Sequence, residues 1–267
     1  MRAPVTVRSG RDIAALVHEI GFLPFYSTPV PGFSLRDLTD PAIWISNDQR
    51  VNPWYYRQDV ALDERIVYGK LFDGKMGFVD LDLFPDFVRV RRDGRDEREM
   101  LDAGLLKPVD LAVLDAIPHG ESRTEPLIKE DLVIEPKGIP AALARLQTAT
   151  FLYTASFEYK LTRGGRPYGW PLAAYMRPEE ELGRERVFPA SDRSYEAARA
   201  ALVERVLAVV PDALERSPEG VVRLIDFAMG PKARKAKVKE ATESEEAKPA
   251  KTARASRKGK TSASAKK

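Results

Sequence analysis

The stretch 107–176 constrains the fold most, because the spacing of its apolar residues changes from helical to extended partway along. Apolar residues recur every three or four positions up to Thr150, and every second position from Phe151 to Tyr159. The pattern predicts helices over 107–117, 125–131 and 138–150, followed by strands over 151–159 and 168–176. Three helices and then a two-stranded hairpin predict a winged helix-turn-helix.

The predicted hairpin has a cationic tip. Lys160, Arg163 and Arg166 lie in or beside the turn at Gly164-Gly165. Side chains of this kind mainly hold DNA phosphates. Pro171 cannot donate a hydrogen bond to a neighbouring strand, so we expect the returning strand to lie at a sheet edge.

The third predicted helix carries the side chains that would read bases. In a helix-turn-helix this helix enters the major groove. Arg145, Gln147 and Thr148 are its polar candidates, and arginine and glutamine can both bind base edges. The helix is otherwise rich in alanine, so a winged helix that packs against protein is the alternative.

Basic residues gather at the C-terminal end of the chain. Residues 231–267 hold 10 Lys and 3 Arg against 4 Glu, a net +9, which leaves −6 for residues 1–230 out of the chain's total of +3. This segment has no aromatic residue, so burial cannot offset its ordering entropy. We expect a disordered tail that binds nucleic acid by releasing counterions, and a solubilising tail is the alternative.

The composition excludes several kinds of site. The chain has no cysteine, which excludes disulfides, zinc fingers and iron–sulfur clusters. Its only imidazoles are His18 and His119, so we expect no metal and no cofactor. No apolar run approaches the roughly 18 residues of a membrane span, and the N-terminus lacks a signal-peptide core. We expect a cytoplasmic, nucleoid-associated protein that binds double-stranded DNA and no membrane, in an oligomeric state that the sequence leaves open.

The whole chain is expected to be of the α+β class. An Asp73-Gly74 dipeptide between two strand-like segments predicts a hairpin over 66–79. The predicted parts are an N-terminal α+β region over 1–106, the winged helix-turn-helix over 107–176, a helical region over 177–230 that packs on the core, and the tail over 231–267.

Carboxylates followed by arginines between residues 80 and 94 are the strongest candidate for chemistry. In a helix, Asp82 and Asp86 would share a face at the i, i+4 spacing. Arg91 and Arg92 follow and could hold DNA phosphates. Two interpretations compete: an acidic helix start with a basic end that suits the helix dipole, or a catalytic carboxylate beside phosphate-binding arginines.

Several short segments together resemble one bacterial family. They are Tyr68-Gly-Lys-Leu-Phe72, Gly77-Phe78, Phe84-Pro-Asp-Phe87, Arg91-Arg-Asp-Gly94, Ala144-Arg-Leu-Gln147, Phe157-Glu-Tyr-Lys160 and Pro167-Tyr-Gly-Trp170. In this order they resemble the AlkZ-related proteins over roughly 21–182. That family takes its name from the AlkZ/YcaQ DNA glycosylases, distant relatives with tandem winged helices that remove alkylated or crosslinked bases. The resemblance implies a winged-helix DNA-binding protein of DNA repair, and it leaves open whether the winged-helix elements occur in tandem here.

The glycosylases use a motif of glutamine, an aliphatic residue, then glutamine or aspartate. None of the three glutamines here, Gln49, Gln58 and Gln147, has such a residue two positions later, so no catalytic residue carries over.

Cleavage of a glycosidic bond would require a group that places water, and a pocket for the extruded base. Our candidates are Asp82 or Asp86 for catalysis and Trp54, Tyr55 or Tyr68 for base stacking. The alternative function is a transcriptional or nucleoid-associated DNA binder without catalysis.

Overall fold

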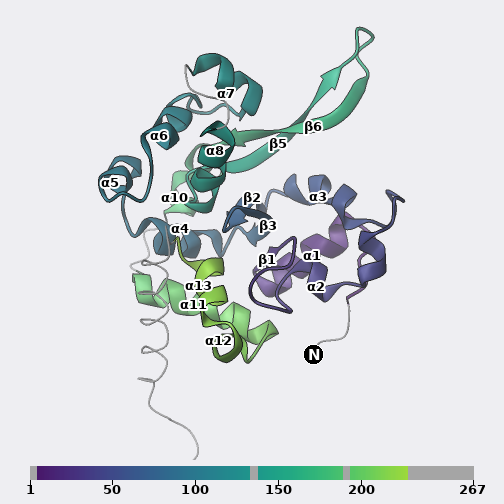
Figure 1. The fold of residues 1–267 in the computed structure, drawn as a ribbon, viewed down its shortest axis with the longest axis vertical. Helices are drawn as coiled ribbons and strands as arrows, with labels where there is room; N and C mark the ends of the chain where they lie inside the picture. Colours follow the sequence, from purple (N-terminus) through teal and green to yellow (C-terminus); the bar gives the residue numbers. More distant parts are fainter. Residues whose placement is uncertain (1–4, 133–137, 189–192, 228–267) are drawn as a thin grey trace, which may run out of the picture.

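The computed structural model describes residues 5–132, 138–188 and 193–227. Within these residues the chain forms thirteen α-helices and two three-stranded antiparallel sheets, so the predicted α+β class is confirmed. The small first sheet lies near the middle of the molecule, and a long hairpin of the second sheet extends outward (Figure 1). The predicted tail over 231–267 lies outside the described residues.

The first sheet has the strand order β1-β3-β2. Its strands are β1 (Phe22–Pro24), β2 (Ile66–Phe72) and β3 (Lys75–Asp80). β2 and β3 are joined through Asp73 and Gly74, whose φ angles are 51° and 76°. A type I′ turn requires positive φ at both central residues, so the predicted hairpin is confirmed.

Four helical segments precede β2 in the chain. They are α1 (Gly10–Ile20), α2 (Leu35–Leu38), the short 3-10 helix η1 (Pro41–Trp44) and α3 (Pro53–Ala61). The Ser9 hydroxyl caps α1 by accepting a hydrogen bond from the backbone amide of Asp12 at 3.3 Å. The apolar stripe of α1 is buried against β1 and β3, as its 3.6-residue spacing predicts.

The carboxylate and arginine segment forms helix α4 (Phe84–Arg92), which is followed by α5 (Glu97–Asp102). Asp86 lies in the first turn of α4, and three arginines lie in its last turn. Each charge therefore opposes the nearer end of the helix dipole, which supports the structural interpretation of this pattern. Asp82 precedes α4, so the expected i, i+4 pair with Asp86 on one helix face is wrong.

The helices and strands predicted within 107–176 are present. They are α6 (Pro108–Asp115), α7 (Glu125–Asp131), α8 (Gly138–Thr148), β5 (Tyr153–Leu161) and β6 (Pro167–Met176). The structure adds a two-residue strand β4 (Arg123–Thr124), which gives a second sheet with the order β4-β6-β5. So short a strand has no alternation of its own, and only its pairing with β6 defines it.

The expectation that Pro171 makes β6 an edge strand is wrong, because β6 is the central strand. β4 pairs only with Ala174 and Tyr175 and does not reach the proline. On the other side, the β5–β6 register shifts between Glu158 and Lys160, opposite the proline. Pro171 is therefore accommodated by a β-bulge within the long hairpin.

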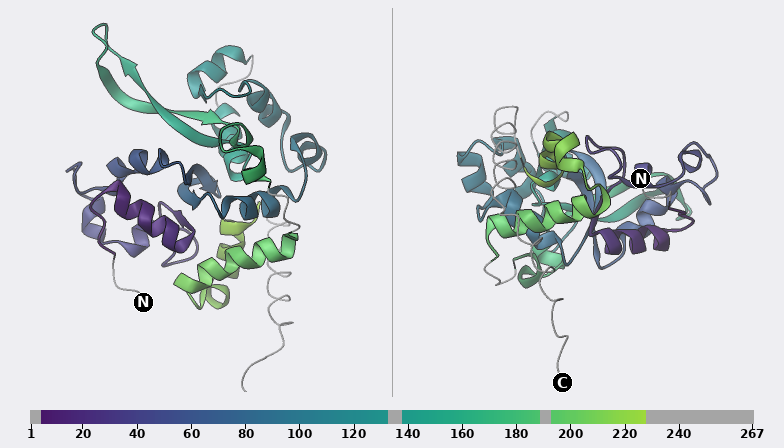
Figure 2. Two further views of the ribbon diagram at one scale, coloured as in Figure 1. Left: turned by 180° about the vertical axis from the view of Figure 1, so that it is seen from behind. Right: turned by 90° about the horizontal axis from the view of Figure 1, so that it is seen from below.

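Five helices follow the second sheet in the chain. They are α9 (Pro178–Glu181), α10 (Arg184–Val187), α11 (Tyr195–Val209), α12 (Ala213–Arg216) and α13 (Pro218–Ile225). Of these, α11, α12 and α13 lie below the first sheet in the view of Figure 1. Buried residues of α11 and α13 join those of the first sheet and α4 in one core, whereas α6, α7 and α8 enclose a second. Figure 2 shows the same arrangement from behind, with the hairpin directed away from α11 and α13. The division into 1–106, 107–176 and 177–230 stays a prediction.

Candidate functional site

Helix α8, the predicted base reader, is covered on two sides. One side faces α6 and α7, and the other lies against β2, the outer strand of the first sheet. Gln147 is 1% exposed; its Oε1 accepts from the backbone amide of Lys70 and its Nε2 donates to the carbonyl of Leu143, both at 2.9 Å. A Cβ at Gly69 would lie 2.8 Å from the Gln147 Oε1, so any other residue at position 69 would have to displace this amide from its hydrogen bond with Lys70.

The expectation that Gln147 reads bases is therefore corrected. Its amide oxygen accepts a hydrogen bond from the outer edge of strand β2, where no further strand is paired. The hydroxyl oxygen of Thr148 lies 2.8 Å from the carbonyl oxygen of Lys70 and 2.9 Å from that of Ala144, so these two carbonyls share its single proton. Arg145 forms an ion pair with the fully buried Asp110, with Nε 2.8 Å from Oδ2. All three predicted base readers are thus engaged within the fold.

Unlike helix α8, the β5–β6 hairpin is not covered by other elements at its free end. Its free end stands clear of the helices in the views of Figures 1 and 2. Lys160, Arg163 and Arg166 are exposed there, and within the described residues none of them forms an ion pair. The structure thus brings these three predicted contacts together at one end of the molecule.

Large apolar side chains accompany these cations. Trp170 is 67% exposed, Leu161 is 61% exposed and Tyr168 is 52% exposed. Exposed apolar residues of this size usually mark a binding surface when they cluster. The sequence reasoning missed them as contacts, although two aromatic residues so close to a Gly-Gly turn were a signal that could have identified them.

The three stacking candidates lie at the base of the hairpin, around α3 and β2. The Arg57 guanidinium stacks over the Trp54 ring with its centre 3.6 Å from the ring centroid. Tyr68 is buried and donates its hydroxyl proton to Met76 Sδ at 2.9 Å, and burial raises the pKa of Tyr68 to about 12. Tyr55 is half-buried on α3. Packing thus occupies the faces of Trp54 and Tyr68, so a base could not stack on them without displacing their neighbours.

The two candidate catalytic carboxylates, Asp82 and Asp86, lie apart, and each forms an ion pair with a different arginine. Asp82 is exposed and accepts a hydrogen bond from Arg65 Nη2 at 2.7 Å. Asp86 is buried on α4 and forms an ion pair with Arg193 Nη1 at 2.5 Å. The two side chains therefore do not form a catalytic pair.

Arg91 and Arg92 are also buried, which corrects the expectation that they bind phosphates. Arg91 donates to the carbonyls of Thr148, Leu224 and Ile225 at 2.9 to 3.0 Å. Burial lowers the pKa of Arg91 to about 9, with a smaller opposing effect from Asp226. Arg91 thus joins the ends of α8 and α13.

Arg92 holds the residue that follows α8. Its Nε donates to the Thr150 hydroxyl at 3.1 Å, and it forms an ion pair with Glu179 at 2.5 Å. Burial lowers the pKa of Arg92, and Glu179 opposes this shift. Thr150 has a φ of 67°, which a β-branched residue rarely adopts, so Arg92 stabilises a strained backbone.

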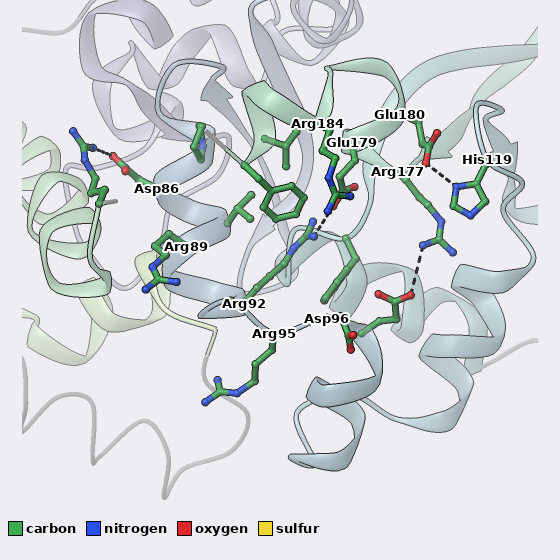
Figure 3. Close-up of a pocket in the computed structure, with 18 of the residues that line it drawn as sticks. Asp86, Arg89, Arg92, Arg95, Asp96, His119, Arg177, Glu179, Glu180 and Arg184 are labelled. Carbon is green, nitrogen blue, oxygen red and sulfur yellow. Dashed lines mark hydrogen bonds and ion pairs between the residues drawn. The ribbon is translucent and has the colours of Figure 1, made fainter. Parts of the chain in front are cut away.

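A cavity of about 840 Å³ opens between α4, the start of α5 and the α9–α10 segment. Asp86 and Arg92 both line it, so the structure brings these two predicted residues to one site. Figure 3 shows Arg89, Arg92 and Arg95 approaching it from one side and Arg184 from the other. Within the described residues, no group of three histidine or carboxylate side chains is arranged to hold a metal. Nor is any helix there long and apolar enough to cross a bilayer.

Comparison with known proteins identifies the family. A family model described as AlkZ related matches residues 7–222. No curated protein and no solved structure matches the chain. The resemblance seen in the short sequence segments is confirmed, and because the match covers most of the chain, the protein belongs to the AlkZ-related family.

Proposed function

We propose that the protein binds duplex DNA and that its elements from α6 to β6 form a winged helix. The order of these elements supports this proposal: a helix, a short strand, two helices and a hairpin, with the sheet order β4-β6-β5. Membership of the AlkZ-related family supports DNA as the partner and DNA repair as the setting.

The observation that carries the proposal is the free end of the β5–β6 hairpin. It combines three exposed cations with the exposed side chains of Leu161, Tyr168 and Trp170. Cations at such a tip can neutralise phosphates, and apolar side chains can press into the minor groove or between base steps. The hairpin is therefore the proposed main contact, and α8 supports it from within the fold.

A DNA binder without chemistry is the second candidate, and one observation favours it. Asp82 and Asp86 are each paired with a different arginine and do not share a helix face, so they do not form the pair of carboxylates that was expected to act together. Release of a base from alkylated DNA, and loss of that release in Asp86→Asn, would instead establish the glycosylase-like activity.

The proposal predicts that replacing Lys160, Arg163 and Arg166 together by alanine weakens duplex binding. Three lost phosphate contacts are expected to reduce affinity by roughly tenfold or more at low salt. Fluorescence anisotropy with a labelled duplex measures this loss in the full chain.

A matched variant keeps the test specific. Alanine at Arg8, Arg11 and Arg98 removes the same charge from exposed positions outside the hairpin. Its affinity should stay close to that of the parent. Equal losses in the two variants would mean that net charge, and not the hairpin, determines binding.

A further inference from the structure

The apolar side chains at the free end of the β5–β6 hairpin are not explained by phosphate contacts alone. Leu161, Tyr168 and Trp170 are exposed there beside the three cations. Among the residues that the structure describes, neither the Tyr168 nor the Trp170 ring packs on another ring or a guanidinium group, and neither side chain forms a hydrogen bond. Two large exposed rings without a partner inside the fold indicate a partner outside it.

The base of the hairpin, by contrast, is fixed to the N-terminal elements. The Phe157 ring lies 6.0 Å from the Tyr68 ring of β2, measured between centroids. Further along β5, the Tyr159 hydroxyl donates to Gln58 Oε1 on α3 at 2.8 Å. The free end of the hairpin stands clear of the helices (Figure 1). The contacts at the base hold this end in a fixed orientation, which lowers the entropic cost of binding.

The backbone near the free end places an aromatic ring next to a cation. Lys160 is directly opposite Tyr168 in the β5–β6 register, so the two side chains lie on the same face of the hairpin. Beside this pair the strands form a bulge, in which Tyr159 of β5 lies opposite residues 169–171 of β6. Gly169 has a φ of 75° and separates Tyr168 from Trp170, so the chain changes direction between the two rings. A cation and two rings are thus presented together at one end of the hairpin.

Exposed aromatic rings bind nucleic acid chiefly by stacking on the faces of bases. In a regular duplex those faces are covered by the neighbouring base pairs, so a base step must first be opened, at a cost in free energy. A base that is unpaired or already unstacked exposes its face without most of this cost. The pair of rings therefore favours DNA with a local defect over a regular duplex.

We propose that the free end of the hairpin recognises duplex DNA at a defect that leaves a base unpaired or unstacked. Tyr168 and Trp170 stack on the exposed bases, and the three cations hold the flanking phosphates. Exposed cations beside the rings favour nucleic acid over an apolar protein surface as the partner. This inference rests on the proposed function, and it names the class of DNA that the hairpin distinguishes.

Fluorescence anisotropy of the full chain with two labelled DNAs tests this inference. One is a regular duplex, and the other is the same duplex with a single extrahelical adenine. The bulged DNA should bind about tenfold more tightly, because stacking adds to the same phosphate contacts. Equal affinities for the two DNAs would overturn the inference and leave the proposed DNA binding intact. The absence of binding to either DNA would contradict the proposed function, and the inference with it.

Replacing both rings tests whether they carry the preference for bulged DNA. Tyr168→Ala with Trp170→Ala should reduce the affinity for the bulged DNA to that for the regular duplex. Both residues are exposed, so this variant should keep the parent's thermal unfolding midpoint. Ile45→Ala with Leu62→Ala removes exposed apolar side chains from outside the hairpin and should keep the full preference. A preference that survives in the ring variant, or that is lost in the control, would overturn the inference.

The fluorescence of Trp170 reports stacking directly. The chain has three tryptophans, and the other two, Trp44 and Trp54, are partly buried. Bulged DNA should quench the emission of the parent protein, because a base stacked on an indole ring quenches its fluorescence. Trp170→Phe should show little quenching but keep most of the preference, since phenylalanine can still stack. Tight binding of bulged DNA without quenching of Trp170 would mean that other residues recognise the defect, and would overturn the inference.

Discussion

Arg91→Met is expected to lower the free energy of unfolding by about 3 kcal/mol. The Arg91 guanidinium donates to three carbonyls, of Thr148 at the end of α8 and of Leu224 and Ile225 at the end of α13. These carbonyls belong to the last turns of their helices, where no intrahelical amide is available. Methionine fills a similar volume but leaves buried acceptors without a donor, and each costs roughly 1–3 kcal/mol.

Urea denaturation followed by circular dichroism measures this change. Arg89→Met is the matched control, because Arg89 lies on the same helix but is exposed. Its effect should stay within about 0.5 kcal/mol. Equal stabilities of the two variants would show that Arg91 does not hold α8 and α13 together.

Asp110→Ala is expected to cost about 3–5 kcal/mol, because it leaves the Arg145 charge in a largely buried position without a counter-ion. Asp110 is 0% exposed, and it also accepts the backbone amide of Lys107 at 2.8 Å at the start of α6. The substitution therefore removes an ion pair and a helix cap together.

A double-mutant cycle isolates the ion pair. Asp110→Ala combined with Arg145→Met should be less destabilised than the sum of the single variants, because the uncompensated charge is gone. Asp115→Ala, at an exposed position of α6, should have little effect. Strict additivity in urea denaturation would mean that Asp110 acts only as a cap.

Local pattern was sufficient for the three helices and the hairpin of 107–176, although it did not identify the short strand β4. The change from a 3.6-residue to a two-residue period identified both the helices and the hairpin, and Asp73-Gly74 identified the turn of the first sheet. These features depend on residues close in sequence. The cationic hairpin tip followed from the same reasoning, and the structure leaves it exposed.

The sequence could not show which polar side chains are exposed to solvent and which are buried. Gln147 was expected to read bases, but its partner is the backbone of Lys70, 77 positions away. Arg91 looked like a surface cation, and its acceptors in α13 lie 133 and 134 positions away. Helical period assigns residues to faces, but only the tertiary structure determines which face another element covers.

The burial of these polar side chains changes the role that we assign to α8. The helix joins the first sheet to the second core through Gln147, Thr148 and Arg145, so it supports the hairpin and does not read bases. In the proposed function, DNA recognition then depends on the hairpin tip, with added electrostatic attraction from the +9 charge of residues 231–267.

The salt dependence of duplex binding by a chain that ends at residue 230 tests this account most directly. Without the basic tail, binding should persist at low salt and weaken steeply as salt rises. Alanine at Lys160, Arg163 and Arg166 should then reduce the slope of log affinity against log salt by up to about 2.7, since each phosphate contact contributes about 0.9. An unchanged slope, or no binding at all once the tail is removed, would contradict the proposed role of the hairpin.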